Sequence, residues 1–235
     1  MKKITFVAIF LLSVCATFAQ KSVRQQNRGE EKPLVEIVTS EGTIVVELFN
    51  DTPVHRDNFI KLVETRFYDS LLFHRVIRNF MIQAGDPNSR NAPYGKMLGD
   101  GTLDYLLPAE ITPNHFHRRG ALCAARMGDN VNPEKKSSPC QFYIVQGRRW
   151  QRHEIDMMRE RMSRQMTEEQ IDVYMREGGA PHLDGDYTVF GQVVSGMDVV
   201  DRIASVKTNR ADRPVDDVTI ITAHVLNTKK AERTR

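Results

Sequence analysis

The stretch from Phe73 to Asp86 carries side chains that could bind and polarise a peptide. Arg75, Phe80, Met81 and Gln83 lie close together around an expected strand–turn–strand. Alternation along the second strand places the side chains of Met81 and Gln83 on one face. This combination predicts an apolar pocket with polar groups at its rim, which is the usual composition of a binding site.

Two later stretches could complete such a pocket. Gln141–Tyr143 supplies a second glutamine and two aromatic rings, and residues 182–191 supply a further wall. From residue types alone, Phe80, Met81 and Leu183 could instead be ordinary core. Arg75 could likewise belong to a surface salt bridge.

Other kinds of catalytic site find little support in the sequence. Ser195 lacks the spacing of a serine nucleophile elbow, and no glycine-rich phosphate loop occurs. His115-Phe116-His117 would place two imidazoles on one face of an extended segment, but no cysteine or carboxylate set accompanies them at metal-ligand spacing. We interpret this segment as a solvated loop and expect neither a metal nor a cofactor.

Four motifs, taken in order along the chain, resemble the cyclophilin family of peptidyl-prolyl cis–trans isomerases. They are FHRVIRNFMIQAGDP at 73–87, QFYI at 141–144, HLDGDYTVFGQV at 182–193 and GMDVVDRI at 196–203. The resemblance extends from about Leu34 to Leu226. PAEI at 108–111 and RRGALCAAR at 118–126 are similar to bacterial members, and with the N-terminal segment described below they indicate an exported bacterial branch.

The resemblance implies a role for each candidate residue. Arg75 matches the catalytic arginine, and Gln83 and Gln141 match side chains that hydrogen-bond the substrate and steady that arginine. Phe80, Met81 and Leu183 match the proline pocket, and Ala125 matches a backbone contact along the peptide. The implied catalytic residues are thus Arg75 and Gln83, and the implied substrate-binding residues are Phe80, Met81, Ala125, Gln141, Tyr143, His182, Leu183 and Tyr187.

The chain departs from the family pattern at several of these positions. Tyr143 stands where phenylalanine is usual, which adds a hydroxyl at the floor or rim of the pocket. His182 stands where cyclosporin-sensitive members have tryptophan, Tyr187 where many have histidine, and Arg126 where asparagine is common. We expect catalysis to survive these changes and cyclosporin to bind weakly, so a submicromolar dissociation constant for cyclosporin would contradict the second expectation.

The elements that must position these residues are mostly short strands. Leu34–Val38 and Thr43–Phe49 predict a hairpin, and Thr52-Pro53 predicts the start of a helix over 53–66. Further strands are expected at 72–76, 81–84, 121–125, 141–145, 187–194 and 218–226, with a helix at 197–204. Eight strands with few helices favour a mainly β fold, a closed eight-stranded antiparallel barrel capped by two α-helices. The family resemblance implies the same architecture.

Residues 147–180 interrupt this pattern as a helical insertion. Ile155, Met158 and Met162 have helical spacing, and Thr167–Gln170 forms a capping box that opens a second helix. The methionines could grip apolar partner segments. We favour the alternative that they form the buried face of the insertion.

The N-terminal residues predict export. Residues 1–19 have the charged start, apolar core and small-residue exit of a signal peptide. Residues 20–33 read as a flexible tether, 34–228 as the isomerase domain and 229–235 as a basic tail. Cleavage after Ala19 is preferred over lipid anchoring at Cys15, because Val14 is bulky for a lipoprotein signal.

Cys123 and Cys140 could form a disulfide in an oxidising compartment, although simple packing is favoured.

Composition limits the class of partner. With 40% hydrophobic and 27% charged residues, the chain is globular rather than disordered. The net charge of +3 falls once Lys2 and Lys3 are removed with the signal, which argues against a nucleic-acid binder. The sequence therefore predicts a monomeric, periplasmic isomerase that acts on proline-containing polypeptides, without stable membrane insertion after signal cleavage. The alternative is a proline-peptide-binding module or chaperone on the same scaffold.

Overall fold

The computed structural model describes residues 31–162 and 164–226. The expected signal peptide, most of the tether and the basic tail lie outside the described residues, as does Cys15. Among the helices of the described chain, none is both long and apolar enough to cross a membrane.

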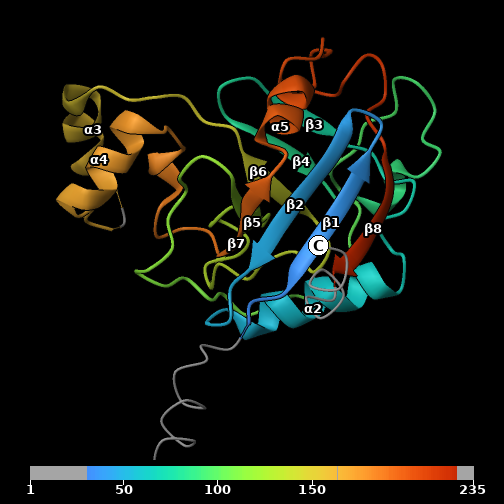
Figure 1. The fold of residues 1–235 in the computed structure, drawn as a ribbon, viewed down its shortest axis with the longest axis horizontal. Coiled ribbons are helices and arrows are strands. Elements are labelled where there is room, and N and C mark those ends of the chain that lie inside the picture. Colours follow the sequence, from blue (N-terminus) through green and yellow to red (C-terminus); the bar gives the residue numbers. More distant parts are fainter. Residues whose placement is uncertain (1–30, 163, 227–235) are drawn as a thin grey trace, which may run out of the picture. The chain divides into compact units, whose positions relative to one another are not determined.

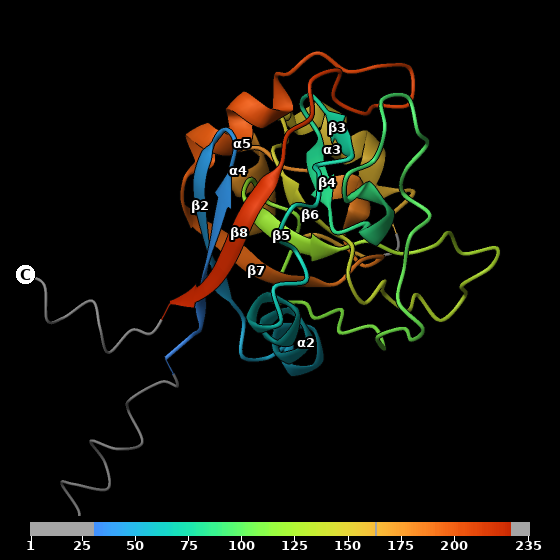
Figure 2. The ribbon, with the colours of Figure 1, turned by 90° about the vertical axis from the view of Figure 1, so that its right-hand side faces the viewer.

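One antiparallel sheet organises the fold (Figure 1). Its strands are β1 (Leu34–Thr39), β2 (Gly42–Leu48), β3 (Arg75–Ile77), β4 (Met81–Ala84), β5 (Ala121–Ala124), β6 (Phe142–Val145), β7 (Val189–Ser195) and β8 (Ile220–Leu226). They lie in the order β3-β4-β6-β5-β7-β2-β1-β8, and Figure 2 shows β8 running beside the β1–β2 hairpin. All eight expected strands are present, and the mainly β prediction is confirmed.

The sheet curls without closing into a barrel, so the predicted closure is not confirmed. Among the described strands, no ladder joins β3 to β8. A few backbone contacts near one end span this gap: Leu72 forms an isolated bridge with Thr219, and the Phe73 amide donates to the Val218 carbonyl at 2.9 Å. These contacts also explain why β3 is shorter than expected, since Leu72 and Phe73 bond to the chain before β8 rather than to β4.

Helices α2 (Pro53–Glu64) and α5 (Met197–Ala204) pack against opposite ends of the curled sheet (Figure 1). The predicted helix at 197–204 is confirmed, and the one at 53–66 ends two residues early. Thr52 precedes α2 but its side chain does not cap the helix. The Glu110 carboxylate instead accepts hydrogen bonds from the Val54 and His55 amides, at 3.0 and 2.9 Å.

Alternation along the strands separates two apolar layers. Ile82, Leu122 and Ile144 point into the main core between the sheet and helices α2 and α5. Met81, Cys123 and Tyr143 point to the opposite face, in a second cluster. That second face carries the pocket described below. Cys123 and Cys140 are buried free thiols in different clusters, as the packing interpretation expected.

Residues 147–180 contain two helices, α3 (Arg152–Arg159) and α4 (Glu168–Arg176). The Thr167–Gln170 capping box is confirmed. The helices share a small core of Ile155, Met166, Ile171 and Tyr174, with Met162 packed against it. For Ile155 and Met162, this supports the buried-face interpretation.

Candidate active site

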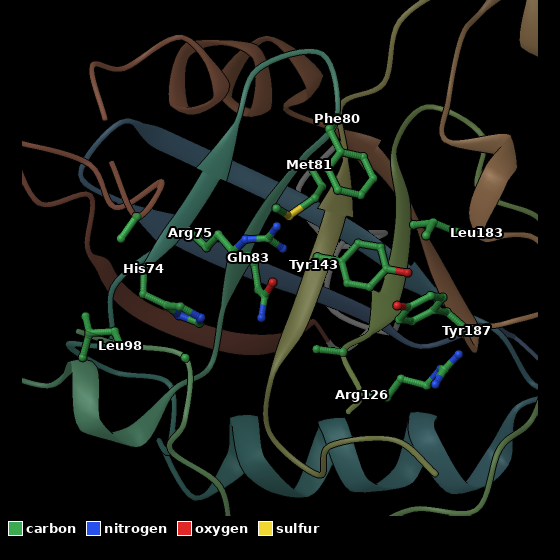
Figure 3. Close-up of a pocket in the computed structure, with 13 residues that line it drawn as sticks. His74, Arg75, Phe80, Met81, Gln83, Leu98, Arg126, Tyr143, Leu183 and Tyr187 are labelled. Carbon is green, nitrogen blue, oxygen red and sulfur yellow. The ribbon is translucent and has the colours of Figure 1, made fainter. Parts of the chain in front are cut away.

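A pocket of about 240 Å³ lies on the second face of the sheet (Figure 3). It is formed by β3, β4, the loops around residues 98 and 211, the chain after β5, β6 and the segment that follows η2, a short 3-10 helix (Pro181–Leu183). Its lining residues are His74, Arg75, Phe80, Met81, Gln83, Leu98, Gly99, Ala125, Arg126, Tyr143, Leu183, Tyr187 and Ala211. Eight of the ten sequence-predicted site residues are therefore brought together.

Strand pairing places the two predicted catalytic residues next to each other. Arg75 on β3 lies directly opposite Gln83 on β4, so both side chains project from the same face of the sheet. The Arg75 guanidinium is 44% exposed, and its ion pair with Asp212 is long, with 3.7 Å between Nε and Oδ2. Such an exposed pair contributes little free energy, so the guanidinium stays accessible from the pocket.

Gln141 stands behind Gln83 rather than in the pocket lining. Gln83 Nε2 donates to Gln141 Oε1 at 2.9 Å, and Gln141 Nε2 donates to the carbonyls of Gly99 and Gly101 at 3.0 and 2.7 Å. The Gln141 amide therefore fixes both the orientation of Gln83 and the loop that carries Gly99. Its side chain thus links Gln83 to the loop around Gly99.

The apolar part of the pocket is built from a turn and two strands. Asn79 has a positive φ of 63° and its amide donates to Gln146 Oε1 at 2.6 Å, which orients the turn that carries Phe80. Phe80, Met81, Leu183 and the ring of Tyr143 surround the space (Figure 3). His182 is not among the lining residues, although its ring lies 5.3 Å from that of Phe80. Burial lowers the pKa of His182, which favours the neutral imidazole.

The Tyr143 hydroxyl lies at the floor of the pocket. Tyr143 is 4% exposed, and its oxygen lies 3.0 Å from His117 Nε2. Burial raises the pKa of Tyr143 well above its ordinary value, so the phenol stays protonated. The hydroxyl is thereby bonded beneath the pocket, and the ring faces the space above.

The interpretation of residues 115–117 as a solvated loop is wrong for His117. This side chain is 1% exposed and its Nδ1 lies 2.8 Å from Asp184 Oδ1. His115 instead stacks on Phe49, with ring centroids 3.9 Å apart, and bonds Asp51 at 2.7 Å. Among the residues that the structure describes, no group of three potential metal ligands lies together.

Five lining residues were not among the sequence-predicted site residues. His74 adjoins Arg75 in the same motif and Arg126 follows Ala125, so their proximity in sequence could have indicated them. Arg126 lies over the ring of Tyr187, with its guanidinium carbon 4.6 Å from the ring centroid. Leu98, Gly99 and Ala211 come from loops without periodic patterns, and the sequence carries no signal for them.

Comparison with known proteins connects this geometry to a family. A family model described as cyclophilin type peptidyl-prolyl cis-trans isomerase/CLD matches residues 34–225. A Staphylococcus aureus protein named as a peptidyl-prolyl cis-trans isomerase is 32% identical over 198 residues, which cover 84% of this chain and 92% of the relative.

Two further matches are less complete or more distant. A Streptococcus pyogenes protein named as a bifunctional phosphatase/peptidyl-prolyl cis-trans isomerase is 35% identical over 199 residues, but this chain covers only 39% of its length. The crystal structure of a Cryptosporidium parvum cyclophilin type peptidyl-prolyl cis-trans isomerase has a TM-score of 0.61 at 22% identity, covering 84% of this chain and 99% of that one. That likeness shows the fold alone. The family match over nearly the whole described sheet shows that this chain belongs to the cyclophilin type peptidyl-prolyl cis-trans isomerases.

Proposed function

We propose that this isomerase catalyses rotation about X–Pro bonds in the pocket that Arg75 lines. Arg75 and Gln83 act on the amide, and the apolar wall holds the proline ring. The observation that carries the proposal is the juxtaposition of an accessible guanidinium with an apolar wall in one pocket. Arg75 and Gln83 share one face across a strand pair, and Phe80, Met81 and Leu183 line the same pocket.

The chemistry needs only a well-placed cation. Rotation about the X–Pro bond is hindered by amide resonance, with a barrier of ~18–20 kcal/mol. A hydrogen bond donated to the proline nitrogen localises its lone pair and weakens the double-bond character as the amide twists. Arginine suits this task because it is permanently charged and directional. Each ~1.4 kcal/mol by which the twisted amide is bound more tightly than the planar one gives about tenfold in rate.

The substrate class follows from the same shape. The pocket combines an apolar wall with Ala125 and the polar side chain of Gln83, so exposed X–Pro segments with little further sequence selectivity are the expected substrates. A second Cryptosporidium parvum structure, determined in the presence of the dipeptide Ala-Pro, supports proline peptides as ligands of this fold.

We further propose that the protein works as a monomer outside the cytoplasm, on the folding of other exported proteins. The support is the sequence of residues 1–19, which has the pattern of a cleavable export signal, together with the bacterial-type motifs at 108–111 and 118–126. Lipid anchoring at Cys15 is the less favoured alternative.

The deciding experiment measures cis-to-trans exchange of an Ala-Pro peptide by two-dimensional exchange NMR. We expect the native protein to accelerate exchange and Arg75→Ala to reduce kcat/KM about tenfold or more, the effect of losing ~1.4 kcal/mol of transition-state stabilisation. Arg78→Ala is the matched control, because Arg78 is an exposed arginine outside the pocket lining. If the peptide binds but neither protein accelerates its exchange, the pocket is a binding module rather than a catalytic site.

A further inference from the structure

Four buried side chains form a continuous run of hydrogen bonds beneath the pocket. Tyr143 on β6 bonds His117 at 3.0 Å, His117 bonds Asp184 at 2.8 Å, and the Tyr174 hydroxyl on α4 donates to Asp184 Oδ2 at 2.6 Å. All four residues are at most 4% exposed. The run therefore connects the floor of the pocket with a helix of the 147–180 segment.

Asp184 fixes the direction of these bonds. Its carboxylate accepts from the His117 amide at 2.8 Å and from the Tyr174 hydroxyl, and it faces His117 Nδ1. A buried carboxylate needs such donors, because an unpaired charge is costly away from water. Nδ1 of His117 therefore donates to the carboxylate, and Nε2, on the other side of the ring, faces the Tyr143 hydroxyl.

Backbone contacts also join the chain around His117 to the chain between Tyr174 and Asp184. The Ala180 amide donates to the His117 carbonyl at 2.8 Å, and Gly179 forms bridges with both Arg118 and Arg148. Asp184 directly follows Leu183, whose side chain lines the pocket. A displacement of α4 would therefore first shift Asp184 and His117, and through their hydrogen bonds it would shift Tyr143.

From this arrangement we propose that His117, Asp184 and Tyr174 are positioning residues for the isomerase pocket, through which α4 fixes the ring of Tyr143 against a bound proline. The inference rests on the function proposed above. It assigns the 147–180 segment a role in substrate binding although, of its residues that the structure describes, none lines the pocket. Without the network, the Tyr143 hydroxyl would lose its hydrogen bond to His117 and with it one of the contacts that position the ring.

Tyr174→Phe tests the proposal because it removes only the hydroxyl that bonds Asp184. We expect KM for the Ala-Pro peptide to rise about threefold to tenfold, the size of coupling found within a hydrogen-bonded network, with a smaller change in kcat. In a Tyr143→Phe background the same substitution has nothing left to position, so its effect on KM should disappear. Tyr68→Phe is the control, since Tyr68 is a buried tyrosine bonded to the Cys140 carbonyl in the main core.

Equal effects of Tyr174→Phe in both backgrounds, or an equal effect of Tyr68→Phe, would overturn the proposal, because either result indicates general loosening. NMR provides a readout that does not need catalysis. Side-chain 15N shifts should show His117 protonated on Nδ1, and Tyr174→Phe should shift the ring resonances of Tyr143. If the native protein does not accelerate exchange, the proposed function fails and these spectra decide the positioning role. Unchanged Tyr143 resonances would refute it.

Discussion

His74 precedes Arg75 and lies buried at the edge of the pocket, with 3% of its surface exposed. Burial lowers its pKa to about 4, an effect that the nearby Asp86 only partly offsets. The imidazole is therefore neutral at pH 7 and adds no second positive charge beside Arg75. Proton binding at this position favours the unfolded chain.

This linkage predicts acid sensitivity. Above pH 6.5 both the folded and unfolded forms of His74 are neutral, and between 6.5 and about 4 only the unfolded form binds the proton. The free energy of unfolding should accordingly fall by about 3 kcal/mol as pH drops through this range. Urea unfolding at pH 7, 5.5 and 4 measures the loss.

His74→Leu provides the comparison, because a leucine of similar bulk does not titrate. The variant should lose about 3 kcal/mol less than the native protein over the same pH range. Identical pH dependence in both proteins would show that His74 does not carry the effect.

At the scale of elements, the turn around Gly179 joins α4 to residues 181–187, which include the pocket-lining residues Leu183 and Tyr187. Gly179 has φ of 150°, and a Cβ at this residue would lie 2.3 Å from the His117 carbonyl oxygen and 2.6 Å from the Tyr174 ring. Both neighbours belong to the positioning network, and one of them is backbone that has little freedom to move.

Gly179→Ala should therefore destabilise the fold by about 2–5 kcal/mol, from backbone strain together with overpacking. In a thermal unfolding experiment this corresponds to a Tm lower by roughly 5–15 °C for a domain of this size. Gly128→Ala is the control, because nothing lies within 4 Å of a Cβ there and its φ is not positive. Equal melting of the two variants would contradict the predicted clash.

The elements that sequence patterns predicted well are those whose signals are local. Helix α5 and strand β4 have the predicted bounds, because periodicity and alternation within a few residues define them. The short β3 and the open sheet edge depend on pairing with residues near 218, far along the chain. No local pattern records that pairing.

The difference between local patterns and long-range pairing also explains which site residues the sequence could predict. Arg75, Met81 and Gln83 could be named because one motif holds them, and the structure gathers all three. His117 was misread because its partner Asp184 lies 67 residues away, so nothing adjacent in sequence marks it as buried. Gln141 was expected from its motif, but only the structure shows that its side chain is hydrogen-bonded to Gln83 and lies outside the pocket lining.

At the scale of the whole molecule, the proposed export would change the net charge. Removal of residues 1–19 would take two lysines and no acidic residue from a chain with net charge +3, which would leave it nearly neutral. A nearly neutral surface suits an enzyme that meets many different unfolded chains, because a strong charge would select partners by charge.

We expect the protein isolated from cells that produce it to begin at Gln20 and to carry no lipid. Intact mass spectrometry with N-terminal sequencing measures both. A chain that begins with a lipid-modified Cys15 would instead establish a membrane-anchored enzyme, and one that retains Met1 would refute export through this signal.

The bridge between Arg148 and Gly179 brings the two ends of the α3–α4 segment together. Because the free energy of closing a loop grows slowly with its length, we expect the chain between these two ends to accept insertions at a small cost in stability. Tyr174 nevertheless connects the segment through Asp184 and His117 to Tyr143. For protein engineering, changes around Tyr174 thus offer a way to vary substrate binding without altering Arg75 or the β3–β4 pair.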